Sequence, residues 1–135
     1  MEKILYLVGN KKFDEEPFEP FAKEVCEFLN FFSVKLSKHK EINKYPDLKT
    51  LSFWCREKNI KKFKNAEKKL DFKIGLGLVF HITPSNIPTN FAYSLIFGLL
   101  SGNSNVVKVP SKKFKQIDII CKILRDLLHK FTFKG

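Results

Sequence analysis

The stretch from Gly75 to Lys112 constrains the fold more than any other part of the chain, because it holds two short apolar runs separated by a longer apolar segment. The first run, Leu78 to Ile82, has the length of one buried strand, and the second is centred on Val106-Val107. Between them, Thr89 to Leu100 ends at Gly102-Asn103, a typical stop signal for a helix. Strand, helix and strand in this order predict a right-handed parallel βαβ unit.

Polar residues follow both predicted strands. The turn Thr83-Pro84-Ser85-Asn86-Ile87-Pro88 comes after the first strand, and Lys108-Val109-Pro110-Ser111 ends the second. In open α/β sheets, ligands bind at the carboxyl ends of the strands. The unusual polar chemistry of this chain therefore lies where a ligand is expected.

The remaining segments are predicted to be mostly helical from their three- and four-residue apolar spacing. They are a strand at 4–8, helices at 20–36, 46–59 and 113–130, an exposed basic helix face or loop at 60–69, and a further strand starting at 131. In the last helix, Ile119, Ile123 and Leu127 widen the apolar stripe, which predicts exposed hydrophobic surface unless further chain covers it. Parallel sheets normally have more than two strands and are covered on both faces, so the chain is interpreted as the front part of a larger α/β protein.

Composition narrows the class of partner. The chain has 135 residues, enough for one domain with a real core, and a net charge of +11 from 25 Lys+Arg against 14 Asp+Glu. Arg56 and Arg125 are the only arginines and the lysines are scattered, which favours a solvated surface over a nucleic-acid interface, although some cations could serve an anionic ligand. No nucleic-acid partner is predicted.

The cysteines and apolar segments bear on the compartment. Cys26, Cys55 and Cys121 form no CxxC pair and no metal-binding spacing, so no metal site is predicted, and a buried inert thiol is the simplest interpretation of Cys26. An odd number of cysteines without a secretion signal argues for a reducing compartment. No apolar segment approaches the ~20 residues that span a bilayer. We therefore expect a cytoplasmic, soluble protein.

The central stretch resembles the aldehyde dehydrogenase superfamily, and more closely the LuxC-type acyl-CoA reductases. The resemblance rests on His81-Ile82-Thr83-Pro84-Ser85-Asn86-Ile87-Pro88, Gly98-Leu99-Leu100-Ser101-Gly102-Asn103 and Val106-Val107-Lys108, and Phe53-Trp54-Cys55-Arg56-Glu57-Lys58-Asn59-Ile60 is similar to the LuxC branch. It implies an α/β fold: part of a doubly wound, Rossmann-like cofactor domain of the aldehyde dehydrogenase type. Residues 1–70 would form an amino-terminal helical region, and residues 71–135 would begin the dinucleotide-binding domain.

The resemblance assigns roles to particular residues. It implies that the Asn86 amide donates to the oxygen of the reacting thioester; the residues alone favour Asn86 as the cap of a helix starting near Ile87. It implies that Lys108 binds the adenosine ribose, the alternative being a lysine that extends from a strand end into solvent. The cofactor-binding set is completed by Ile82, Thr83, Pro84, Ser85 and Ser111. A serine at 111, where NAD-preferring relatives often carry a glutamate, with lysines beside it, favours NADP(H).

Other motifs are given structural interpretations. Gly75 and Gly77 precede a strand, so they do not form a dinucleotide fingerprint, and His81 is interpreted as a hydrogen-bonded core or strand-edge histidine. The family's catalytic cysteine lies far downstream of the lysine motif, and none of the three cysteines matches it. The resemblance therefore implies an amino-terminal fragment of a reductase that makes fatty aldehyde from acyl-CoA or acyl-protein thioesters, inactive alone, with possible homo-oligomerisation or pairing with a carboxy-terminal portion. The alternatives are a non-enzymatic basic module that binds a nucleotide, an acyl carrier or RNA, and a fragment of a free-aldehyde dehydrogenase.

Overall fold

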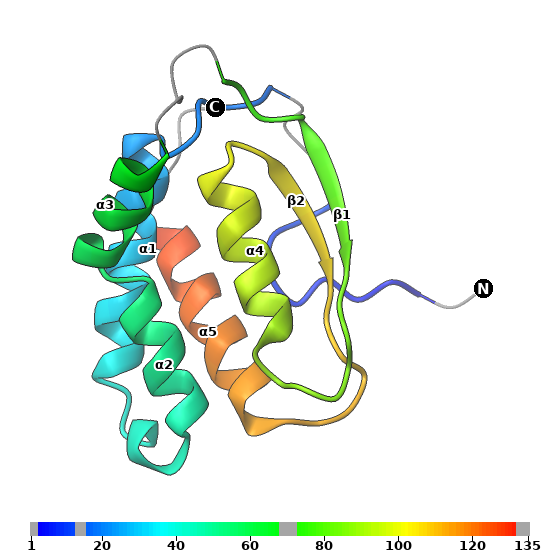
Figure 1. Ribbon diagram of the computed structural model, residues 1–135. Helices are drawn as coiled ribbons and strands as arrows, with labels where there is room; N and C mark the ends of the chain where they lie inside the picture. The colour runs from blue at the N-terminus through cyan, green and yellow to red at the C-terminus, as the bar shows by residue number, and fades with distance from the viewer. Residues whose placement is uncertain (1–2, 13–15, 68–72, 132–135) are drawn as a thin grey trace.

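The chain forms a mixed α/β structure that is mostly helical, with a small parallel sheet (Figure 1). The computed structural model describes residues 3–12, 16–67 and 73–131. The elements are α1 (Lys23–Ser37), a short 3-10 turn η1 (Ile42–Lys44), α2 (Pro46–Trp54), α3 (Glu57–Ala66), β1 (Leu78–Ile82), α4 (Asn90–Leu100), β2 (Ser104–Lys108) and α5 (Lys115–Lys130).

The predicted βαβ arrangement is confirmed in its order and its parallel pairing. Strands β1 and β2 pair from Leu78 opposite Ser104 to Ile82 opposite Lys108, and α4 connects them. The stop signal acts as expected: Gly102 has a φ of +82°, its N–H bonds the carbonyl of Leu99, and the N–H of Asn103 bonds the carbonyl of Gly98. These two bonds form a Schellman motif, which ends α4 and turns the chain directly into β2.

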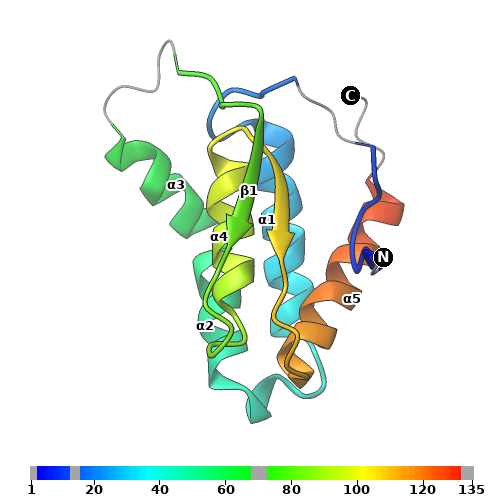
Figure 2. The same cartoon turned by 90° about the vertical axis from the view of Figure 1, so that its right-hand side faces the viewer.

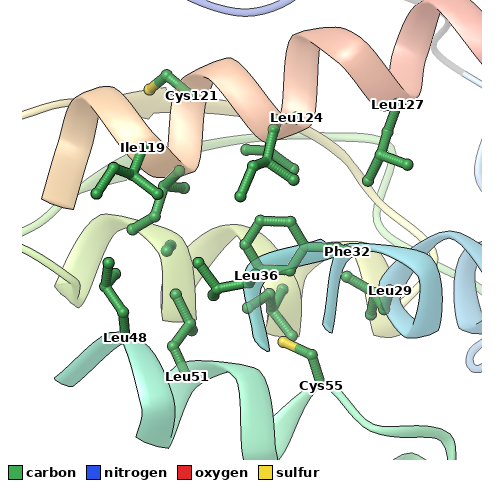
Figure 3. Close-up of a cluster of buried hydrophobic side chains, with 14 of the residues drawn as sticks. Leu29, Phe32, Leu36, Leu48, Leu51, Cys55, Ile119, Cys121, Leu124 and Leu127 are labelled. Atoms are coloured by element: carbon green, nitrogen blue, oxygen red, sulfur yellow. The ribbon is translucent and has the colours of Figure 1, made fainter. Parts of the chain in front are cut away.

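Helix α1 lies at the centre of the helical layer and contacts α2, α3, α4 and α5. Its buried side chains recur at helical spacing and are packed between α2 and α5 (Figure 3). The largest fully buried side chains include Leu29, Phe32 and Leu36 of α1 with Leu48 and Leu51 of α2. The core therefore sits among the helices, and the sheet lies on its outside against α4.

The prediction that the last helix exposes its widened apolar stripe is wrong. Ile119, Ile123 and Leu127 are all buried. Figure 3 shows Cys121 pointing away from Leu124 on the same helix, so α5 is covered on more than one side. Part of that cover comes from the amino-terminal segment, where Leu7 and Val8 pack against the core.

The prediction that β1 is buried is also wrong. Leu78, Phe80 and Ile82 are 45%, 60% and 74% exposed, while Val79 and His81 on the other face are half-buried toward α4. In Figure 2 the two strands lie in front of α4, and none of the described elements covers their outer face. The outer face of the sheet is thus an exposed apolar surface.

Two boundaries in the amino-terminal part of the chain differ from the prediction. Residues 4–8 form no strand; the carbonyl of Leu7 instead accepts a hydrogen bond from Nη1 of Arg125 at 2.8 Å. Helix α1 begins at Lys23, because Phe21 has a φ of 56°, outside the helical region.

The predicted helix at 46–59 is two helices. Arg56 is extended, with a ψ of 142°, and separates α2 from α3. The Oδ1 of Asn30, on α1, accepts the N–H of Glu57 at 3.1 Å and so caps the start of α3. The basic run is confirmed as an exposed helix face as far as Ala66, and its residues 68 and 69 lie outside the described residues. Of the strand predicted to start at 131, residues 132 and 133 also lie outside the described residues, and Phe131 is not in a strand.

A backbone junction joins three distant parts of the chain. The N–H of Phe18 bonds the carbonyl of Gly102 at 2.9 Å, and the carbonyl of Phe18 accepts the N–H of Gly75 at 3.0 Å. A Cβ on Gly102 would collide with the Phe18 carbonyl, and one on Gly75 would collide with the Gly102 carbonyl. These two positions therefore require glycine, which fits the bend or close backbone approach predicted at Gly75.

Candidate functional site

The candidate site lies at the carboxyl ends of β1 and β2. Ile82 and Lys108 are the last residues of the two strands and are partners in the parallel register. In Figure 1 both arrowheads point to the end of the molecule where α4 and α5 begin. The strand register thus brings the Thr83–Pro88 turn and the Lys108–Ser111 segment to the same end of the sheet.

The turn after β1 presents a mixed polar surface. Pro84, Ser85 and Asn86 are exposed, and Thr83 is half-buried. The Oγ1 atom of Thr83 is buried and has no hydrogen-bond partner among the described residues. Because a buried hydroxyl without a partner is unfavourable, this atom is a candidate contact for a ligand.

The interpretation of Asn86 as a helix cap is wrong. Helix α4 begins at Asn90, and its N-cap residue is Thr89, three residues after Asn86. The Asn86 side chain is therefore exposed in the turn without serving the helix, and its amide can donate to a ligand.

The start of α4 complements an anion. No side chain caps the helix, and its first turn contains no acidic residue. The positive end of a helix dipole attracts negative charge, especially where no carboxylate already occupies it. An anionic group at the end of the sheet would meet this helix terminus.

The segment after β2 supplies cations. Lys108, Ser111, Lys112 and Lys113 are all exposed, and Lys108 forms no ion pair with any described residue. Nζ of Lys112 lies 5.0 Å from the ring centroid of Phe114, so an aromatic side chain positions that cation. Together with the start of α4, these residues fit a ligand that carries phosphate groups and hydroxyls, such as a dinucleotide.

His81 lies on the face of β1 that packs toward α4, away from these residues. Its Nε2 is 2.8 Å from Oδ1 of Asn105, and Nδ2 of Asn105 donates to the carbonyl of Asn103 at 2.7 Å. The prediction of a hydrogen-bonded strand histidine is confirmed. An open groove beside α4, lined by His81, Tyr93 and Phe97 among others, runs along this side of the sheet.

The cysteines are shielded from ionisation. Burial raises the pKa of Cys55 to about 12 and that of Cys121 to about 11. Cys26 is half-buried, not fully buried as predicted, and desolvation raises its pKa against the opposing effect of Lys64. A thiol nucleophile needs a lowered pKa, so none of the three is prepared for acyl transfer.

No helix among the described residues is both long enough and apolar enough to cross a bilayer.

One contact near the candidate site was not predicted from the sequence. Nε2 of Gln116, in the first turn of α5, donates to Oδ2 of Asp47 at 3.1 Å and so ties that helix start to α2. The separation of these residues in sequence leaves no local signal for the contact.

The family comparison covers this whole region. The acyl-CoA reductase (LuxC) family matches residues 44–129, which include α2 to β2, both segments of the candidate site and nearly all of α5. No curated protein and no solved structure matches the chain. Because the match spans more than half of the sequence, the chain belongs to the acyl-CoA reductase (LuxC) family.

Proposed function

We propose that this chain is the amino-terminal portion of an NADPH-dependent acyl-CoA reductase that converts long-chain acyl thioesters to fatty aldehydes. One observation carries the proposal: the pairing of Ile82 with Lys108 brings a cationic strand end beside the turn that begins at Thr83, at the end of the sheet where α4 starts. Membership of the LuxC family supports the substrate class. Residues 71–135 would begin a Rossmann-like cofactor domain, with residues 1–70 as a helical region before it.

In this proposal different site residues contact different parts of the cofactor. The turn residues Ile82 to Ser85 and the start of α4 would line the dinucleotide phosphates, while Lys108 and Ser111 would hold the adenosine ribose. Bound NADPH would supply the hydride. The exposed lysines next to Ser111 favour a 2′-phosphate through charge, because no carboxylate lies at 111 to repel it.

Asn86 is the proposed catalytic contribution of this chain. Its amide lies in the exposed turn and would donate to the oxygen on which negative charge develops as the acyl carbon becomes tetrahedral. The acyl group would be carried by a cysteine outside this chain. The raised pKa values of Cys55 and Cys121 support that assignment, because neither thiol ionises near neutral pH.

Cofactor binding by the isolated chain tests the proposal directly. NADPH is titrated against the wild-type chain, Lys108→Ala and the matched control Lys122→Ala, whose lysine lies on α5 and pairs with Asp126. We expect NADPH to bind, Lys108→Ala to weaken binding about tenfold, the loss of one charge-assisted contact, and the control to bind as wild type. If both variants lost the same affinity for NADPH, Lys108 would contribute only general surface charge. If NADH bound at least as tightly as NADPH, the proposed cofactor preference would be wrong.

A further inference from the structure

Four aromatic side chains from three helices form a continuous row on the surface. Trp54, at the end of α2, stacks on Phe63 of α3, with ring centroids 5.5 Å apart and planes 15° apart. Phe53 contacts Trp54 edge-on at 5.8 Å, and Phe63 contacts Phe97 of α4 at 6.2 Å. We call these four residues the aromatic row.

The aromatic row is open to solvent. Phe53, Trp54 and Phe97 are 46%, 42% and 53% exposed. Monomeric soluble proteins rarely leave several large aromatic side chains in contact with one another at the surface, and such patches mark interaction sites. The row is therefore a candidate surface for a partner with an apolar component.

Helix α3, which carries Phe63 of the aromatic row, is predominantly positive. Its side chains Lys58, Lys62 and Lys64 are exposed and form no ion pair with any described residue. Lys61 is different, because it binds Glu57 at 2.7 Å. Helix α4 brings no charged residue to the row. The partner must therefore combine an apolar phase with negative charge.

An anionic lipid surface fits this combination best. Trp and Phe side chains enter the boundary between headgroups and acyl chains, while lysines extend their ammonium groups to anionic headgroups. Single-stranded RNA fits less well, because bases need free ring faces to stack on. Here Phe63 covers one face of Trp54, and the guanidinium of Arg56 lies 4.2 Å from the ring centroid of Phe53.

We infer that the aromatic row and its flanking lysines dock the protein onto anionic membrane surfaces. The inference does not rest on the proposed reductase function. The docked face would consist of the end of α2, the exposed side of α3 and Phe97 of α4. Binding would be peripheral, with the rings at the lipid interface.

Trp54 is the only tryptophan in the chain, so its fluorescence reports on this surface alone. The wild-type protein is mixed with vesicles of phosphatidylcholine, with or without phosphatidylglycerol. We expect the Trp54 emission to shift to shorter wavelength, and to be quenched by brominated acyl chains, only with the anionic vesicles. An unchanged emission with bound protein would overturn the inference, because a chain of net charge +11 can also adsorb through other faces.

Two pairs of variants separate the specific surface from general charge and apolarity. The double variant Lys58→Glu/Lys62→Glu should weaken binding to anionic vesicles tenfold or more, because each lysine near the surface contributes roughly 1 kcal/mol. The control Lys38→Glu/Lys40→Glu changes two lysines just after the carboxyl end of α1 and should weaken binding much less. Phe97→Ala should weaken binding about tenfold through lost apolar contact, and Phe31→Ala, with a similarly exposed ring (49%) on α1, should not. Circular dichroism confirms that each variant is folded. Equal losses of affinity within each pair would overturn the inference. So would a higher affinity of the protein, measured by Trp54 fluorescence, for single-stranded RNA than for the anionic vesicles.

Discussion

Lys108 and Ile82 are the last partners in the parallel sheet, so a cation and an apolar strand end lie side by side where the chain turns away on both strands. Lys108 is exposed, and Ser111, three residues later in the chain, is exposed as well. Under the proposed function, Ser111 lies beyond the end of β2, so a substitution there would change cofactor preference without touching the strands.

Ser111→Glu is expected to reverse the proposed preference for NADPH. A carboxylate at this exposed position would repel a 2′-phosphate and accept hydrogen bonds from free ribose hydroxyls. NADPH binding should weaken at least tenfold, while NADH binding stays the same or improves. Fluorescence titration of both cofactors checks the prediction, and Ser85→Glu, in the exposed turn after β1, shows whether any added carboxylate has the same effect.

Gly102→Ala should destabilise the fold strongly. The residue has a φ of +82°, and a Cβ there would collide with the carbonyl of Phe18. Gly9 is a matched control: its φ is +75°, but nothing lies within 4 Å of an added Cβ. Gly9→Ala should therefore cost about 1 kcal/mol for the left-handed conformation alone, and Gly102→Ala several kcal/mol, measured by urea unfolding. Similar losses for the two variants would argue against the steric collision.

Ser33 and Ser52 should behave as an energetically coupled pair. Each hydroxyl donates to the backbone carbonyl of the other residue, at 2.6 Å and 2.9 Å, and both side chains are buried where α1 meets α2. Each single change to alanine should cost about 1–2 kcal/mol, because a buried partner loses its hydrogen bond. The two hydroxyl oxygens also lie 3.3 Å apart, and either change removes this contact, whereas the backbone carbonyls remain. A double-mutant cycle should therefore give a coupling energy of at least ~0.5 kcal/mol; strictly additive losses would contradict an interaction between the two hydroxyls.

Stability should fall at alkaline pH because of the buried thiols. Above pH 9 the thiols ionise in the unfolded chain, whereas burial keeps Cys55 and Cys121 protonated in the folded chain up to pKa values of about 12 and 11. Unfolding then releases protons, so the free energy of unfolding decreases by at most ~1.4 kcal/mol per pH unit for each thiol. The loss begins near pH 9 and continues as pH rises toward those values. Cys55→Ala should show a shallower decrease between pH 9 and pH 10 than wild type, and identical slopes would contradict the raised pKa of Cys55.

The outer face of the sheet should bind hydrophobic dyes. Phe80 is 60% exposed, so Phe80→Thr should change the free energy of unfolding by no more than ~0.5 kcal/mol while reducing the binding of an anilinonaphthalene dye. Phe32→Ala, at a position only 1% exposed, should instead cost ~3–5 kcal/mol. Dye binding that is unaffected by Phe80→Thr would place the accessible apolar surface elsewhere.

The parts of the fold that were predicted well from the sequence are those determined by interactions between residues close together in the chain. The strand Leu78–Ile82 has the predicted bounds, and α4 differs by one residue, because Gly102 and the apolar run before it act within a few residues. The break at Arg56 was missed because its support comes from Asn30 on α1. No local pattern reports such a contact.

Burial was harder to predict than secondary structure. The apolar pattern of Leu78, Phe80 and Ile82 shows that these residues can be buried, but their actual exposure depends on what lies across the sheet. Conversely, the amino-terminal residues Leu7 and Val8 pack against the core without forming the predicted strand. At the candidate site, sequence placed Asn86 and Lys108 at the strand ends, whereas the unpaired Thr83 hydroxyl needed the three-dimensional structure.

The backbone junction of Phe18, Gly75 and Gly102 also sets an order of events in folding. Phe18 cannot complete its two bonds until the chain has been made as far as Gly102, near the end of the βαβ unit. Contacts between residues so distant in sequence form late, since a long loop must close before they contribute. During synthesis the junction can therefore close only after Gly102 has been made, and translation that stops before Gly102 would release a chain in which the N–H of Phe18 lacks this partner.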